Sequence, residues 1–232
     1  MKIPTNLITG FLGVGKTTAI LDLLARRQGP GRWAVLVNEF GQVGLDGARF
    51  EAEGVVVREV AGGCICCAAQ LPMRVALTRL LRELRPARLI IEPTGVGHPA
   101  GIIDALRDVW LAPHIELRSV ITLVDPHQFA DARFQALETY RDQLALADVL
   151  VANRCDLATP GEVEAFLAAA RACYPPKLHV ALTEQGRLDP AWLDLGHDDM
   201  RPTPVSGHAE AGRFVSRGWR FGPEVVFERE AV

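Results

Sequence analysis

The chain contains 232 residues, of which 49% are hydrophobic and 23% are charged. These proportions are typical of a globular protein, and they exclude a collagen-like, coiled-coil or disordered chain as a description of the whole. Lys and Arg together number 25 against 28 Asp and Glu, which gives a formal net charge of −3. Because a non-specific nucleic-acid binder needs a basic surface to neutralise phosphates, we expect no nucleic acid among the partners.

The N-terminus and the cysteines indicate the compartment. The first residues, MKIPTNLITGFLG, lack the long apolar core and the small-residue cleavage site of a signal peptide. No stretch reaches the ~18 apolar residues that a membrane span would need, so we expect no membrane association. Three of the five cysteines lie within four positions, which favours reduced thiols over a disulfide framework. We therefore expect a cytoplasmic protein.

Strands and helices are predicted to alternate along most of the chain. The predicted strands are residues 6–9, 33–37, 55–57, 88–91, 120–124, 149–152 and 178–181. The predicted helices are residues 17–27, 70–84, 100–109, 129–146 and 160–173. The helix at 70–84 is expected to turn five apolar side chains inward, namely Val75, Leu77, Leu80, Leu81 and Leu84. The alternation predicts an α/β fold with a mostly parallel central sheet flanked by helices.

A glycine-rich motif follows the first predicted strand. Residues 10–18, GFLGVGKTT, fit the pattern G-x-x-x-x-G-K-[ST] of a P-loop, whose backbone N–H groups surround a phosphate. Lys16 would bridge the β- and γ-phosphates of a nucleotide, and the Thr17 hydroxyl would bind Mg²⁺. The predicted nucleotide-binding residues of this loop are Gly10, Gly13, Val14, Gly15, Lys16, Thr17 and Thr18.

A second motif follows the strand at 149–152 and predicts the choice of base. Residues 153–156 read N-R-C-D, which is close to the N-K-x-D pattern of guanine-binding loops. A carboxylate at Asp156 would accept a hydrogen bond from guanine N1–H, which adenine lacks, and Asn153 completes the motif. Arg154 replaces the Lys of that pattern, although an arginine stem can also lie across a base. The alternative is an ordinary turn with Asp156 as a cap.

The strand at 88–91 leads into the sequence E-P-T-G. Glu92 could orient the waters of Mg²⁺ or the attacking water, and the Gly95 N–H could sense the γ-phosphate. Glu92 as a simple strand-end charge is the alternative. Because phosphoryl transfer to water depends mainly on positioning and charge neutralisation, we expect hydrolysis, with Lys16, Glu92 and Gly95 as the catalytic residues.

A cysteine cluster lies between these motifs. Residues 62–67 read G-G-C-I-C-C, and three thiolates could converge on one soft or borderline ion such as Zn²⁺ or Cu(I). The predicted metal ligands are Cys64, Cys66 and Cys67. Three ligands leave a fourth position for water, a carboxylate or a recipient's residue, which suits a carrier. Redox chemistry and inert thiols are the alternatives, and a coupling of metal affinity to nucleotide state is our hypothesis.

The composition changes near residue 188 and suggests a domain boundary. We predict a P-loop GTPase domain at residues 1–190, a linker at 191–212 that is rich in Pro and Gly, and the start of a truncated C-terminal domain at 213–232. The scattered histidines are weaker signals. His197 could join an accessory metal site with three residues of this stretch, but a solvated linker is the favoured interpretation; the three residues are Asp198, Asp199 and His208.

Together, these motifs in this order resemble those of the CobW-type P-loop GTPases, which are related to the urease and hydrogenase metal chaperones UreG and HypB. The resemblance runs from about residue 3 to residue 188, with a trace at 214–230. It implies GTP binding, slow hydrolysis, and delivery of a metal, often zinc or cobalt, to a client protein. Three departures from the family pattern are expected. Arg154 replaces a Lys, and Gln42 stands where the family's N-E-F-G-E has a second carboxylate. The family also carries a full C-terminal domain, of which only the first strand is expected here.

We therefore predict a GTP-binding and GTP-hydrolysing metallochaperone. Its expected ligands are GTP, Mg²⁺ and Zn²⁺ or Co²⁺, and its expected partners are a metal-requiring client protein and, as one possible assembly, a second copy in a homodimer. Two alternatives stay open. One is an ATP-using P-loop enzyme such as a small-molecule kinase, and the other is a non-catalytic nucleotide-binding regulatory module.

Overall fold

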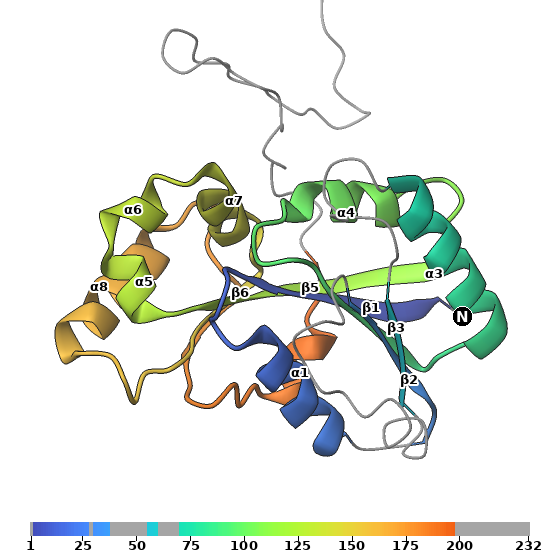
Figure 1. The fold of residues 1–232 in the computed structure, drawn as a ribbon, viewed down its shortest axis with the longest axis horizontal. Helices are drawn as coiled ribbons and strands as arrows, with labels where there is room; N and C mark the ends of the chain where they lie inside the picture. Colours follow the sequence, from blue (N-terminus) through green and yellow to red (C-terminus); the bar gives the residue numbers. More distant parts are fainter. Residues whose placement is uncertain (1, 28–29, 38–54, 60–69, 198–232) are drawn as a thin grey trace, which may run out of the picture.

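A computed structural model describes residues 2–27, 30–37, 55–59 and 70–197 (Figure 1). Seven strands pair in parallel in one sheet with the order β3-β2-β4-β1-β5-β6-β7. The strands are β1 Ile3–Gly10, β2 Trp33–Val37, β3 Val55–Glu59, β4 Arg88–Glu92, β5 Ile115–Val124, β6 Val149–Ala152 and β7 His179–Leu182. The predicted α/β fold with a parallel sheet is confirmed.

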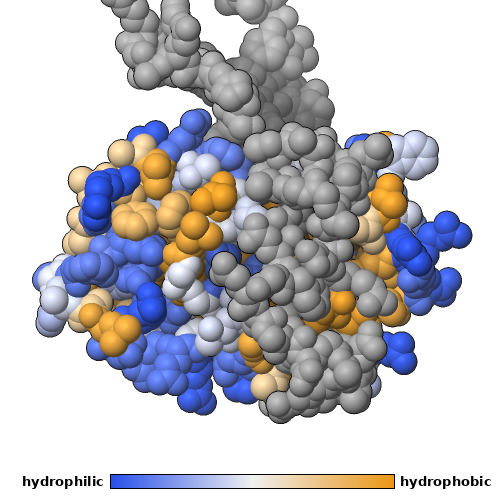
Figure 2. All heavy atoms as spheres, viewed as in Figure 1, coloured by the Kyte–Doolittle hydropathy of each residue, from blue (hydrophilic) through white to orange (hydrophobic). Residues whose placement is uncertain are grey.

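Helices cover both faces of this sheet. In Figure 1, α3 and α4 lie above the sheet and α1 lies below it. The helices are α1 Lys16–Ala25, α3 Gln70–Leu84, α4 Pro99–Leu106, α5 Pro126–Ala130, α6 Ala132–Gln135, α7 Glu138–Leu146, α8 Pro160–Ala172 and the 3₁₀ helix η1 Pro190–Asp194. Within the described ranges, none of these helices has the length and apolarity to cross a membrane. On the face shown in Figure 2, hydrophobic side chains are interspersed with hydrophilic ones over the described part of the chain.

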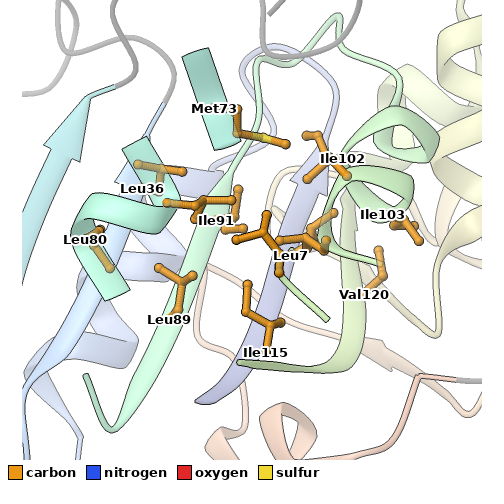
Figure 3. Packing of buried hydrophobic residues seen from close by; sticks show 14 of the residues in the cluster. Leu7, Leu36, Met73, Leu80, Leu89, Ile91, Ile102, Ile103, Ile115 and Val120 are labelled. Carbon is orange, nitrogen blue, oxygen red and sulfur yellow. The ribbon is translucent and has the colours of Figure 1, made fainter. Parts of the chain in front are cut away.

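The core forms two main layers because side chains alternate across the strands. Leu7 and Ile8 are both 0% exposed, yet Leu7 packs in the layer under α3 and α4 while Ile8 packs in the layer against α1. Ile91 and Ile90 of β4 alternate in the same way. Figure 3 shows the first layer, in which Met73 of α3 lies close to Ile91 and Ile102. Strands buried on both faces explain the nearly continuous apolar runs of the sequence.

The predicted apolar stripe of α3 is partly wrong. Val75 was expected to point inward but is 60% exposed, whereas Met73 is 0% exposed. Among the side chains described from residue 73 onward, the buried ones are Met73, Leu77, Leu80 and Leu81, which follow the spacing i, i+4, i+7 and i+8 of one helical face. Val75 lies off that face. The prediction that it points inward relied on its hydrophobicity and not on its position in the helical repeat.

The single helix predicted at 129–146 is also wrong. The structure has three short helices in this region, α5, α6 and α7. Asp131 adopts an extended conformation between α5 and α6, and its carboxylate accepts a hydrogen bond from the Arg133 N–H at 2.9 Å. A side chain that satisfies the first free N–H groups starts a new helix at this point and interrupts the old one.

The described residues 190–197 pack onto the sheet. Leu193 of η1 is 1% exposed in the core layer of α1, and the His197 Nδ1 lies 2.6 Å from the Asp148 Oδ2. His197 is therefore a packed residue, and the solvated linker favoured by the sequence is corrected at this position. Residues 198–212 of the predicted linker lie outside the described residues, and they include the three residues proposed to join His197 at a metal site. The predicted C-terminal element at 213–232 also lies outside the described residues.

The packing of α3 generates a stability prediction. Met73→Ala should lower the free energy of unfolding by about 2–5 kcal/mol because it leaves a cavity in the core. Val75→Ala, two residues away on the exposed face, should change it by no more than about 0.5 kcal/mol. Urea denaturation of the two variants measures both values, and equal losses would contradict the assignment of the buried face.

Candidate functional site

The phosphate loop connects β1 to α1 at the carboxyl edge of the sheet. Gly10, Gly13 and Gly15 adopt φ values of 140°, 77° and 95°, which side-chain-bearing residues avoid. A Cβ on Gly10 would collide with the Leu123 carbonyl oxygen, and a Cβ on Gly15 would lie 2.6 Å from the Asn153 Nδ2. These two glycines are therefore required by the shape of the loop, which brings its backbone N–H groups and the N-terminus of α1 to one place.

Lys16 begins α1 and is only 8% exposed. Its ammonium group donates a hydrogen bond to the Phe11 carbonyl oxygen at 3.1 Å and so reaches back over the loop. This contact holds the ammonium group over the loop that the sequence predicts to bind phosphates. Of the other predicted loop residues, Val14 is buried in the core layer of α1, and Thr18 is exposed in the first turn of α1.

Thr17 and Glu92 form the polar centre of the site. Parallel pairing of β1 with β4 places Glu92, the last residue of β4, beside the loop that follows β1. The Thr17 hydroxyl donates a hydrogen bond to the Glu92 Oε1 at 2.7 Å. A hydroxyl and a carboxylate are oxygen donors of the kind that Mg²⁺ prefers, directly or through its waters. The pair therefore fits the expected Mg²⁺ site.

The charge of Glu92 is disfavoured in the folded chain. Burial raises the pKa of its carboxyl group above the ordinary value, while the hydrogen bond from Thr17 and the positive charge of Lys16 oppose that rise. A partly buried carboxylate beside a phosphate loop is poised to gain a cation. Groups with shifted pKa values cluster at functional sites because catalysis and ligand binding need such shifts.

Gly95 lies in a turn against the phosphate loop. The Gly97 N–H donates to the Thr94 carbonyl at 3.0 Å, which closes the turn. A Cβ on Gly95 would lie 2.7 Å from the backbone nitrogen of Leu12, so only glycine permits this approach. The structure therefore brings Lys16, Glu92 and Gly95 to the same loop.

Asn153 has a different environment from the one that base reading alone suggests. It is 2% exposed, and its Nδ2 donates to the Val14 carbonyl oxygen at 2.8 Å while its Oδ1 accepts from the Gly186 N–H at 2.9 Å. Asn153 thus ties the phosphate loop to the loop that follows β7. Sequence reasoning did not identify Gly186, whose signal is only a glycine after a short strand; its φ is 73°.

Asp156 and Arg154 lie in the turn that follows β6, at the same edge of the sheet as the phosphate loop. Asp156 is exposed. Arg154 has a φ of 65°, and its Nη1 lies 3.1 Å from the Asp125 Oδ2. This ion pair gives a structural reason for arginine at the position, since its planar fork reaches the cap of α5. An exposed carboxylate in this turn can accept hydrogen bonds from a base.

The predicted metal ligands Cys64, Cys66 and Cys67 lie outside the described residues, as does Gln42. Helix α3 begins at Gln70, three residues after the last cysteine of the cluster. Within the part of the chain that the structure describes, no three His, Cys, Asp or Glu side chains form a group that could hold a metal ion.

The fold and the loop define a P-loop nucleotide-binding domain. Residues 4–179 match the family described as CobW/HypB/UreG, nucleotide-binding domain, and the chain belongs to that family. The resemblance stated from the motifs is thereby confirmed.

Two curated relatives are zinc chaperones. The chain is 44% identical over 214 residues to the zinc chaperone YeiR of Escherichia coli, covering 92% of this chain and 65% of YeiR. It is 35% identical over 184 residues to the zinc chaperone CobW of a Sinorhizobium species, covering 67% of this chain and 52% of that protein. The chain thus spans less than two thirds of the length of these relatives.

Two solved structures share the fold. The Zn(II)-bound YjiA GTPase of E. coli has a TM-score of 0.59 and 27% sequence identity, covering 83% of this chain and 61% of YjiA. HypB from Helicobacter pylori, solved in complex with nickel, has a TM-score of 0.54 and 17% identity, covering 82% of each chain. The likeness to HypB shows the fold alone.

The buried position of Asn153 leads to a prediction. Asn153→Ala should lower the free energy of unfolding by about 1–3 kcal/mol, because it leaves the Val14 carbonyl and the Gly186 N–H without partners. Asp156→Ala, at the exposed position three residues later, should change stability by no more than about 0.5 kcal/mol. Chemical denaturation of nucleotide-free protein tests the contrast.

The pKa of Glu92 leads to a second prediction. Because burial raises this pKa, the unfolded chain releases the proton first, so the free energy of unfolding should fall as the pH rises above the ordinary glutamate value of 4.5. Glu92→Gln keeps an acceptor for Thr17 and removes the cost of burying the charge of Glu92. Without nucleotide, the variant should be more stable than wild type at neutral pH, and denaturation across a pH series measures the difference. The exposed Glu164→Gln on α8 is the matched control, and equal stability of Glu92→Gln and wild type at every pH would contradict the assignment.

Proposed function

We propose that this protein is a GTP-dependent zinc chaperone that binds and slowly hydrolyses GTP and delivers a transition metal to a client protein. The observation that supports this most directly is the hydrogen bond between Thr17 and Glu92 beside the phosphate loop. It joins the P-loop and the E-x-x-G segment in one site, as phosphoryl transfer to water requires.

The nucleotide part of the proposal assigns roles to these residues. The loop N–H groups and Lys16 bind the phosphates, and Thr17 and Glu92 hold Mg²⁺ directly or through water. When bound, Mg²⁺ supplies positive charge that neutralises the phosphates. Gly95 offers its N–H to the γ-phosphate. Hydrolysis by this arrangement depends on positioning, which is consistent with slow intrinsic turnover.

Base selection is assigned to the loops that follow β6 and β7. Asp156 accepts hydrogen bonds from guanine N1–H and its exocyclic amine, and Asn153 aligns the two loops with the phosphate loop. Adenine would leave the Asp156 carboxylate without a donor, which is costly. GTP is therefore the proposed substrate, and an ATP-using enzyme is the alternative that the experiment below distinguishes.

The metal part of the proposal depends on the cysteine cluster. Cys64, Cys66 and Cys67 would bind Zn²⁺ or Co²⁺ as thiolates, which suit such ions better than Mg²⁺. The names of the relatives YeiR and CobW as zinc chaperones support zinc as the cargo. Reduced thiols persist in the cytoplasm, which is the compartment we propose.

The partners are proposed from the surface beside the nucleotide site. Leu12 of the phosphate loop and Val96 of the neighbouring turn are 53% and 47% exposed. Exposed apolar side chains next to a nucleotide-dependent loop could contact a client protein or a second copy of this chain in a homodimer.

The choice of base can be tested by substitution. Asp156→Ala should weaken GTP binding by about 10- to 100-fold, the value of a hydrogen bond to a charged group, and should leave ATP binding unchanged. Asp104→Ala, which removes an exposed carboxylate from α4, is the matched control. Isothermal titration with both nucleotides provides the measurement, and a wild-type protein that prefers ATP would exclude guanine selection.

The coupling of metal to nucleotide can be tested by zinc titration. The variant Cys64→Ser, Cys66→Ser, Cys67→Ser should lose zinc binding, while Cys173→Ser, outside the cluster, should keep it. In wild type, zinc affinity should differ between the forms bound to a non-hydrolysable GTP analogue and to GDP. Equal affinities in the two forms would remove the coupling and leave a GTPase with an independent metal site.

A further inference from the structure

Helix α7 packs against both the phosphate loop and the turn that contains Gly95. Its Tyr140 is 2% exposed, and the Tyr140 ring lies 5.9 Å from the ring of Phe11 in the phosphate loop, at an angle of 71°. Three residues further along, Gln143 is also 2% exposed and faces the turn. Figure 1 shows α7 next to α4, the helix that follows this turn. One short helix thus contacts both parts of the proposed hydrolytic site.

Gln143 binds the turn through its side-chain amide. The Nε2 donates to the Gly95 carbonyl oxygen at 3.0 Å and to the Gly97 carbonyl oxygen at 3.1 Å. An amide group has two N–H donors, so both are used on this one turn. The Gln143 Oε1 is buried and has no hydrogen-bond partner among the described residues. Gln143 therefore donates both N–H groups to the turn while its own carbonyl oxygen stays unpaired, and a buried side chain with such an unpaired atom calls for an explanation beyond packing.

A hydrogen bond within the turn sets the direction of the Gly95 N–H, and Gln143 holds that turn in place. The peptide that carries this N–H also carries the Thr94 carbonyl, which accepts from the Gly97 N–H at 3.0 Å. Because a peptide group is planar, fixing the Thr94 carbonyl also fixes the direction of the Gly95 N–H. Gln143 donates to the carbonyl oxygens of both Gly95 and Gly97, so it holds the two glycines of this turn at once.

The rest of α7 is anchored to the same region. The Asp142 Oδ2 lies 2.8 Å from the His98 Nδ1, directly after the turn. The Gln143 carbonyl accepts from the Thr122 hydroxyl at 3.2 Å, and that hydroxyl lies 2.7 Å from the hydroxyl of Thr9, which precedes Gly10. A continuous set of buried hydrogen bonds therefore joins the end of β1 to the turn. Its members are fixed by packing, so the turn cannot shift without breaking them.

We propose that Gln143 is a positioning residue for GTP hydrolysis, which holds the 94–97 turn against the phosphate loop so that the Gly95 N–H meets the γ-phosphate. The inference rests on the proposed GTPase function and adds to it a residue that no motif contains. Gln143 does not touch the nucleotide in this arrangement, and it acts through Gly95 and Gly97. GDP, which lacks the γ-phosphate, does not use the turn, so its binding is independent of Gln143.

The test compares Gln143→Met with the matched control Gln135→Leu. Gln135 also donates its side-chain Nε2 to a carbonyl oxygen, that of Phe129 at 2.9 Å, but lies in α6 away from the turn. For Gln143→Met, we expect affinity for a non-hydrolysable GTP analogue to fall about tenfold relative to affinity for GDP, and kcat to fall by a similar factor. Gln135→Leu should keep both the affinity ratio and kcat within about twofold of wild type.

Gln143→Asn keeps the amide but is one methylene shorter, so it cannot reach both carbonyls. If Gln143→Met does not fold, this variant provides the same test, with a smaller fall in the ratio of the two affinities. An unchanged ratio and kcat in a folded Gln143 variant, or a ratio that shifts in favour of the GTP analogue, would overturn the positioning role. If wild type does not hydrolyse GTP, the proposed function itself fails. If wild type hydrolyses GTP and the Gln143 variants behave like it, only the positioning role fails.

Discussion

The parallel direction of all seven strands is the constraint on which the site depends. Parallel strands end at one edge of the sheet, so the segments after β1, β4 and β6 meet there although they are far apart in the sequence. The phosphate loop, Glu92 and Asn153 are the residues that follow or end these strands. An antiparallel β4 would place Glu92 at the opposite edge, and the contact between Thr17 and Glu92 could not form. The direction of the strands therefore brings the residues of the site together, and the residue types then decide its chemistry.

Buried amide side chains then fix the loops relative to one another. Asn153 joins the phosphate loop to the loop after β7, and Gln143 joins α7 to the turn that contains Gly95. Each amide bonds backbone groups that would otherwise lack a partner in the interior. The carboxylate of Glu92 is different, because burial disfavours its charge more than the hydrogen bond from Thr17 and the charge of Lys16 favour it. The buried charge of Glu92 lowers the stability of the nucleotide-free chain, and such a cost is expected where function opposes stability.

The parts of the fold that were predicted correctly depend on local patterns. Apolar runs identified every strand of the described sheet, and G-x-x-x-x-G-K-T identified the phosphate loop, because each signal lies within a few consecutive residues. The helix at 129–146 failed since Asp131 caps a new helix through its own side chain, which periodicity does not register. Gln143 and Gly186 were missed for another reason: their partners lie 48 and 33 residues away, and only the folded chain brings them together.

Helix α3 follows the cysteine cluster in the sequence and packs beside the end of β4. The helix begins three residues after Cys67 in the sequence, and its buried side chain Met73 packs in the same core layer as Ile91, the residue before Glu92 (Figure 3). A close-packed core transmits displacements because it contains few voids to absorb them. A shift of the β4 end that accompanies the γ-phosphate would therefore reach the start of α3 through one layer of side chains. The proposed coupling between nucleotide and metal would therefore use the packing of α3 against the end of β4.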